Sequence, residues 1–183
     1  MQAKDGAVPG ARAALILLLF INMFNYLDRY VLAAVETDIE ETFFPETDYP
    51  RDPETKERLD KTIEGKIGSL NLAFMVTYML IAPLFGWLAD RMRRWLLVGI
   101  GVILWSLASG ATGLAATFLI LFLARCLVGV GEAAYGPVAP TVIADLYPVS
   151  KRGSKLAWFY VAIPVGSALG YVVGGQVAYW MNG

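Results

Sequence analysis

Histidine is absent from this 183-residue sequence, and cysteine occurs once, at Cys126. Without imidazole, the chain lacks the side chain that most often binds metals and most often acts as a general base. No nucleophile motif is present either, so the sequence predicts neither an enzyme nor a bound cofactor. A single cysteine also excludes a disulfide framework within the chain. The net charge of -1 offers no basic surface to nucleic acid, which we do not expect as a partner.

Charged residues are scarce as well. They make up 17% of the sequence, whereas 57% of the residues are hydrophobic. Soluble domains contain about 25% charged and about 45–50% apolar residues. The apolar residues lie in long runs separated by short charged patches, which is typical of helices that cross a bilayer. We therefore predict an all-α, integral multi-pass membrane protein whose main surroundings are the membrane bilayer.

Five long apolar runs predict five transmembrane helices, at about residues 12–35, 67–89, 95–115, 118–146 and 156–181. Residues 1–11 form a short polar tail before the first of them. A signal peptide is the alternative explanation of the first run. The helical pattern continues through residues 25–30, however, and no clear small-residue cleavage site is present.

Residues 36–66 separate the first two spans with an acidic, proline-containing segment. We expect a solvated loop, with a short helix over residues 53–62 that could continue into the second span. A role of the acidic side chains in repelling anions is the less favoured alternative, because runs of charge usually face water.

Basic residues gather in the tail, in the connector between the second and third spans, and in the connector between the fourth and fifth. An arrangement of five spans places these three segments on the same side of the membrane. Loops rich in lysine and arginine stay in the cytoplasm. The sequence therefore predicts a cytoplasmic N-terminus and an extracytoplasmic acidic loop, and we expect the protein in the cell (inner) membrane.

Four ionisable residues interrupt the predicted spans: Asp28 and Arg29 in the first, Arg125 and Glu132 in the fourth. Each costs about 2.5–3.5 kcal/mol or more at the centre of a bilayer, so these side chains should face a cavity or one another. With a rise of about 1.5 Å per residue, the first three lie near a common depth. A static ion-pair cluster that locks two helices together is one explanation. A pathway for substrate or protons is the favoured one.

Asn22, Asn25 and Arg29 share one face of the first predicted helix at spacings of three and four residues. A spanning helix with such a polar stripe lines a water-filled path or the interior of a bundle. In the fifth span, Gly166, Gly170 and Gly174 form a ridge of small residues, which we expect to permit close packing against another helix.

Two motifs are more specific. The run Gly86-Trp-Leu-Ala-Asp90-Arg91-Met-Arg-Arg94 resembles the signature between the second and third helices of the major facilitator superfamily. Residues 125–131 resemble that superfamily's fourth-helix motif, and residues 148–153, which include Arg152, its next cytoplasmic turn.

The combination of residues 25–30 with residues 131–140, which include Tyr135, resembles the spinster-type branch of that superfamily. Members of that branch move lysophospholipids or sphingosine phosphate. The resemblance covers residues 12–175. Two positions depart from the superfamily pattern: Arg93 stands where glycine is usual, and Tyr171 replaces the proline of the antiporter motif, so antiport is not established by that motif.

The resemblance implies a fold of two six-helix halves that rock around a central site. Five spans would then form most of the N-terminal six-helix bundle, with the C-terminal half of the transporter as the missing partner. It also implies two groups of functional residues. The substrate and proton pathway comprises Asp28, Arg29, Arg125, Glu132, Asn22, Asn25 and Tyr135, and a conformational latch comprises Gly86, Asp90, Arg91, Arg94 and Arg152.

The leading functional hypothesis is proton-coupled transport of an amphiphilic lipid such as a lysophospholipid. Arg29 and Arg125 would bind its phosphate, since arginine suits contacts through two nitrogens, and Glu132 would carry the coupled proton. A small organic anion such as a sugar acid is an alternative substrate, because arginine binds carboxylates equally well. A non-transporting membrane scaffold or truncated paralogue is a third possibility.

Overall fold

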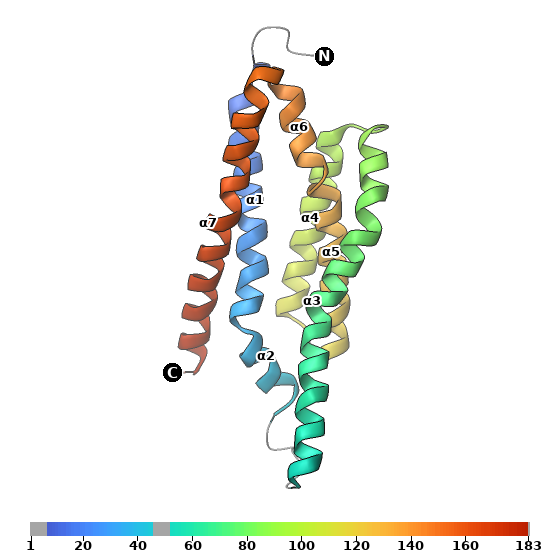
Figure 1. Cartoon of the computed structure of the whole chain (residues 1–183), viewed down its shortest axis with the longest axis vertical. Coiled ribbons are helices and arrows are strands. Elements are labelled where there is room, and N and C mark those ends of the chain that lie inside the picture. The colour runs from blue at the N-terminus through green and yellow to red at the C-terminus, as the bar shows by residue number, and fades with distance from the viewer. Residues whose placement is uncertain (1–6, 46–51, 183) are drawn as a thin grey trace.

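The computed structural model describes residues 7–45 and 52–182, and all the regular secondary structure in these ranges is helical (Figure 1). Seven helices follow one another in these described ranges: α1 (Ala11–Ala34), α2 (Glu36–Phe43), α3 (Pro53–Ala89), α4 (Arg94–Gly113), α5 (Phe118–Tyr135), α6 (Val138–Leu146) and α7 (Val149–Asn182). Taking α5 and α6 as one span, five segments of the described part of the chain are long and apolar enough to cross a membrane. The predicted class, an all-α membrane protein with five spans, is confirmed.

The helix α3 joins two segments that the sequence analysis treats separately. Asp52 caps its start by accepting from the backbone N–H of Thr55 at 3.0 Å and from its hydroxyl at 2.7 Å, and Pro53 occupies the first turn. These hydrogen bonds, that of the Thr55 hydroxyl first, lower the pKa of the Asp52 carboxyl. The ion pairs Glu54–Arg58 and Glu57–Lys61 support the first turns. The short helix after Asp52 therefore runs without a break into the second span.

The acidic segment after α1 differs from the expected loop, because Glu36–Phe43 forms the helix α2. Glu36 and Asp38 in its first turn complement the positive end of the helix dipole. At its other end, the rings of Phe43 and Phe44 lie 6.4 and 5.6 Å from the ring of Phe118 at the start of α5. Aromatic packing of this kind holds α2 against the bundle. The remainder of the expected loop includes residues 46–51, which lie outside the described residues.

The fourth span is divided into α5 and α6 by Gly136 and Pro137. The N–H of Gly136 still donates to the Glu132 carbonyl at 2.7 Å, but Pro137 has no N–H to continue the ladder. Gly136 also allows the Tyr78 hydroxyl of α3 to come close, since a Cβ at this position would lie 2.8 Å from that oxygen. The break redirects the chain just after the buried Glu132.

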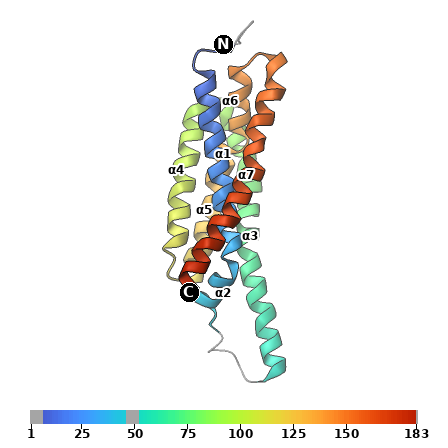
Figure 2. The same ribbon diagram turned by 90° about the vertical axis from the view of Figure 1, so that its left-hand side faces the viewer.

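The helices form two sets. Figure 1 shows α1 beside α7 on one side, and α3, α4 and α5 together on the other, and Figure 2 shows the same bundle from its left-hand side. We call the end at which α1 begins the upper end, as in Figure 1, and the opposite end the lower end. At the upper end α6 packs between the two sets, where Val138, Ala139 and Ile143 are fully buried. The Tyr147 hydroxyl donates to the Ala11 carbonyl at 2.9 Å and fixes this end.

The glycine ridge of α7 provides the contact with α1. A Cβ built at Gly170 would lie 2.7 Å from the Cβ of Tyr30, and one at Gly174 would lie 2.6 Å from the Cβ of Ala34. Side chains cannot approach so closely, so only glycine permits this spacing of the two backbones. The predicted packing role of the ridge is confirmed.

Replacing Gly170 by leucine should force α1 and α7 apart, because the new side chain would overlap with Tyr30. Overpacking of this kind costs about 1–3 kcal/mol. We therefore expect a lower midpoint of thermal unfolding, followed by circular dichroism in detergent micelles. Gly175→Leu is the matched control, since a Cβ there has no neighbour within 4 Å. An equal loss of stability in both variants would contradict the role of the ridge.

Candidate functional site

A half-buried ion pair connects the two sets of helices near their middle. Arg29 of α1 donates through Nη2 to Oε2 of Glu132 in α5. Glu132 is only 3% exposed. The structure thus brings together one charge from the first span and one from the fourth, as the sequence analysis expects. Asn25, on the same face of α1, is buried beside them, with its side-chain amide next to the Glu132 carboxylate.

Aromatic rings surround the guanidinium of Arg29. Its carbon lies 4.9 Å from the ring centre of Tyr26 and 4.6 Å from that of Phe74 in α3. The faces of such rings attract a cation, most strongly where water is excluded. The charge of Arg29 is therefore held by a carboxylate and by two rings that come from different helices.

The other two intramembrane charges form no hydrogen bond or ion pair with these two among the described residues, although Arg125 is close enough to act on Glu132 electrostatically. Asp28 accepts through Oδ2 from Trp105 Nε1 at 3.1 Å and from Ser109 Oγ at 2.6 Å, both in α4. Arg125 is 2% exposed, and its Nε has no hydrogen-bond partner among the described residues. The sequence analysis missed Trp105 and Ser109. Their spacing of four residues puts two donors on one face of an otherwise apolar helix, which is the signal that could have found them.

Two further residues of the predicted pathway form hydrogen bonds to backbone carbonyls of neighbouring helices. Asn22 Nδ2 donates to the Phe159 carbonyl of α7 at 3.1 Å. The Tyr135 hydroxyl donates to the Leu18 carbonyl of α1 at 2.8 Å. Both side chains are buried and connect α1 to its neighbouring helices, so their hydrogen bonds stabilise the packing of these helices.

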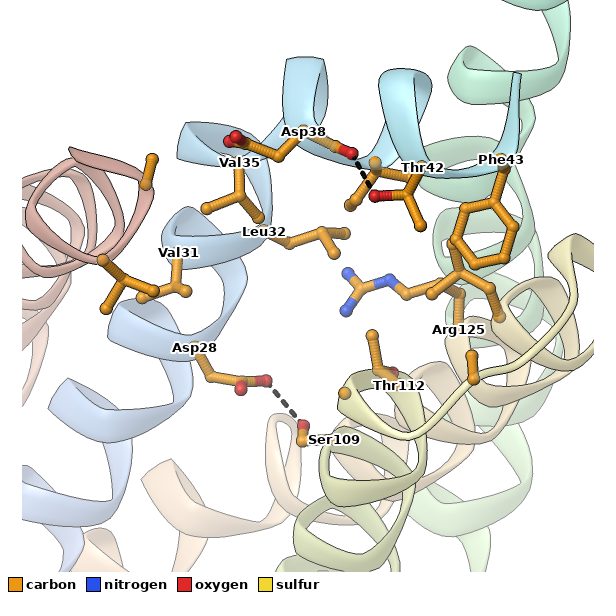
Figure 3. A pocket seen from close by; sticks show the side chains of 16 residues that line it. Asp28, Val31, Leu32, Val35, Asp38, Thr42, Phe43, Ser109, Thr112 and Arg125 are labelled. Carbon is orange, nitrogen blue, oxygen red and sulfur yellow. Dashed lines mark hydrogen bonds between the residues drawn. The ribbon is translucent and has the colours of Figure 1, made fainter. Parts of the chain in front are cut away.

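A pocket of about 380 Å³ opens near the lower end, between α1, α2, α4, α5 and the end of α7. Its walls are mainly aliphatic. Figure 3 shows the Arg125 guanidinium extending into its centre, with the Asp28 carboxylate on one side and Thr42 and Asp38 of α2 on another. Arg29 and Glu132 do not belong to its lining. The four charges are thus divided between an ion pair at the centre and a pocket nearer the lower end.

The predicted latch residues lie at the upper end. Arg94 Nη1 contacts Asp145 Oδ2 at 2.5 Å, and its Nη2 is 3.9 Å from Asp90 Oδ1. Arg91 instead covers the ring of Trp87, with its guanidinium carbon 3.9 Å from the ring centre. Asp145 was missed by the sequence analysis, although an acidic residue at the end of the fourth span, facing a basic connector, is a detectable signal.

The two remaining latch residues, Arg152 and Gly86, are not part of the ion pair between Arg94 and Asp145. Arg152 Nε donates to the backbone carbonyl of Tyr147 at 3.0 Å, and so provides a hydrogen bond for this carbonyl between α6 and α7. Gly86 has open space beside it, since a Cβ there would have no neighbour within 4 Å. The structure therefore unites only part of the predicted latch, namely Asp90 and Arg94. In residues 7–45 and 52–182, no group of three or more potential metal ligands is present.

Known proteins resemble this chain in both sequence and fold. Residues 18–182 match the profile of the Major Facilitator Superfamily. The chain belongs to this family. It is 40% identical to protein spinster homolog 1 of Rattus norvegicus over 164 residues, which cover 88% of this chain and 28% of that protein. It is 39% identical to protein spinster of Drosophila melanogaster over 165 residues, which cover 90% of this chain and 24% of that protein.

A solved structure shows the same arrangement of helices. The crystal structure of a bacterial homolog to the human lysosomal transporter spinster, in an inward-facing and occupied conformation, matches with a TM-score of 0.78 and 28% identity, covering 93% of this chain and 33% of that one. The spinster-type resemblance and the fold of a partial N-terminal bundle are thereby confirmed. The chain spans about a quarter to a third of the length of these relatives.

Changing Tyr135 to phenylalanine should weaken the contact between α5 and α1, because it removes the hydroxyl that donates to Leu18. Hydrogen bonds between membrane helices contribute about 0.6 kcal/mol on average. We expect a small decrease in the thermal unfolding midpoint in micelles. Tyr179→Phe is the matched control, since Tyr179 is 72% exposed. If the two variants are equally stable, the hydrogen bond between Tyr135 and Leu18 does not contribute to the stability of the bundle.

Proposed function

We propose that this chain acts in a secondary active transporter that moves an amphiphilic lipid, such as a lysophospholipid, by alternating access and with protons as the coupling ion. The observation that supports it best is the ion pair Arg29–Glu132, which joins the two helix sets and whose carboxylate is buried. Membership of a transporter family makes the class of activity expected. The lipid as substrate is what the spinster-type resemblance of the sequence implies.

The position of Glu132 supports the proposed proton coupling. Its carboxylate is almost completely buried, and Arg29 is its ion-pair partner. Protonation of Glu132 removes the negative charge, so the Arg29 guanidinium loses its ion-pair partner while its aromatic neighbours remain. Protonation of Glu132 therefore favours any conformation of the transporter in which α1 and α5 are separated and Arg29 contacts another anion or water.

Orientation is part of the same proposal. The upper end of the bundle carries the connectors at residues 90–94 and 147–155, which hold most of the basic residues outside α3. The positive-inside rule makes this end cytoplasmic. The ion pair Arg94–Asp145 then lies at the cytoplasmic surface, where it acts as a latch that must open and close as the two halves of a transporter rock.

A small organic anion is the second candidate substrate. It is favoured by the size of the pocket at Arg125, about 380 Å³, which is small for a complete lipid. Uptake of a lysolipid and of a sugar acid, measured side by side in proteoliposomes, separates the two candidates. Uptake of the sugar acid alone would exclude the lipid.

Replacing Glu132 by glutamine should abolish uptake of lysolipid or make it independent of a pH gradient, because the amide cannot take up the coupled proton. The measurement is uptake by proteoliposomes with and without an imposed gradient. Glu64→Gln is the matched control, since Glu64 lies on an exposed turn of α3. Uptake by Glu132→Gln that keeps its normal pH dependence would reject this residue as the proton carrier.

Replacing Arg94 by glutamine should loosen the upper end, because the side chain loses both Asp145 and Asp90. Distances between spin labels at the upper ends of α4 and α6 should become broader. Arg93→Gln serves as control, since the exposed Arg93 forms no ion pair with a described residue. Identical distance distributions in the two variants would contradict the latch.

A further inference from the structure

The ring of Phe74 in α3 is shared by two guanidinium groups. The guanidinium carbon of Arg29 lies 4.6 Å from the ring centre, and that of Arg125 lies 5.5 Å from it. Arg29 belongs to α1 and Arg125 to α5, so the ring contacts one cation from each helix set. Phe74 is 6% exposed and Arg125 is 2% exposed. The face of a ring attracts a cation most strongly where water is excluded, as it is around these side chains.

Close packing of α3 against α5 fixes the position of this ring. A Cβ built at Gly129 of α5 would lie 2.7 Å from the backbone carbonyl oxygen of Phe74, so a larger residue at this position would push the two helices apart. The side chain of Phe74 packs with Trp105, Ala108 and Val128 in a buried apolar cluster. The ring therefore cannot move away from the arginines without disrupting the core of this helix set.

The same two cations are attracted by the carboxylate of Glu132. Arg29 is its ion-pair partner, and Arg125 acts on it electrostatically. Arg125 is also attracted by Asp28, whose carboxylate is bound by α4. The ring and the Glu132 carboxylate thus attract the same guanidinium groups from two directions. If the ring attracts them less, they are free to move toward the carboxylate.

The other polar groups that face Glu132 carry no charge at neutral pH. Asn25 of α1 has its amide next to the carboxylate. The phenol groups of Tyr26 in α1 and Tyr78 in α3 are close enough to interact with Glu132, and Tyr160 of α7 lies near both of them. Phenols and amides are neutral at this pH. The positive charge that acts on Glu132 therefore comes from the two arginines that share the ring.

We propose that Phe74 is a positioning residue for proton uptake at Glu132, and that its ring stabilises the protonated state by holding Arg29 and Arg125 when the carboxylate becomes neutral. With Glu132 ionised, both the carboxylate and the ring hold the two cations. With Glu132 protonated, the ring remains as their shared partner. The proposal rests on the proposed function only for the statement that this proton is coupled to transport.

The test replaces Phe74 by phenylalanine analogues that carry one, two or three fluorine atoms, incorporated at this position alone. Fluorine weakens the attraction of the ring face for cations and leaves the shape of the side chain nearly unchanged. The measurement is the infrared band of the protonated Glu132 carboxyl, assigned by its loss in Glu132→Gln, as a function of pH in uncharged micelles. We expect the pH midpoint of this band to fall with each added fluorine, by about one unit over the series.

The same analogues at Phe24 are the matched control, because Phe24 is 53% exposed. They should leave the midpoint unchanged. Phe74→Leu provides a second variant, since it keeps an apolar side chain but has no ring, and its midpoint should fall as well. If Phe74→Leu does not fold, the fluorinated series still decides, because it preserves the packing.

A side chain that only fills space predicts a different result. Its fluorinated analogues would keep the midpoint of the unaltered chain, and this outcome overturns the proposal. An equal shift in the series at Phe24 overturns it too, because the effect would then not depend on contact with the arginines.

Failure of this role can be told from failure of the proposed function. Uptake of lysolipid by proteoliposomes is measured beside the infrared titration. A constant midpoint across the series, with uptake that still depends on pH and is lost in Glu132→Gln, refutes the role of Phe74 and leaves transport standing. A midpoint that falls with fluorination, in a chain whose uptake does not respond to pH, supports the role of Phe74 and refutes proton coupling.

Discussion

The exclusion of water from the bilayer governs this structure, because every polar group inside it must find its partner within the protein. The two helix sets are held together by such partners, since Arg29 binds Glu132, Asp28 binds α4, and Tyr135 binds a backbone carbonyl of α1. Within each set the contacts are close and apolar. The interface between the sets is therefore more polar than the sets themselves, and it is the part of the bundle whose stability depends most on charge.

The fold could be predicted from the sequence because the apolar runs that indicate its helices are long. In lipid, an apolar run of about 20 residues is stable as a helix that spans the bilayer. The glycine ridge likewise predicted a packing face without naming its partner, and the partner proved to be α1. The helix α2 was not predicted, since its eight residues are acidic and its stability comes from phenylalanines that contact a distant part of the chain.

The candidate site was predicted in its residues but not in its pairing. Helix geometry gives depth and face, so it correctly brought the charges of the first and fourth spans together. It does not give side-chain direction across a gap between helices, and for that reason it could not decide which charge of the first span would pair with Glu132. Trp105 and Asp145 were missed although each binds a charge, because the sequence analysis considered only the ionisable residues well inside the predicted spans.

The length of α3 has a practical meaning. Its 37 residues extend over roughly 55 Å, whereas the hydrocarbon core is about 30 Å thick. Several capped and charged turns after Asp52 therefore project beyond the bilayer as a stiff rod continuous with a spanning helix. An antibody fragment raised against this rod would report the tilt of the whole helix, and its added mass outside the membrane would help to align particles in single-particle imaging.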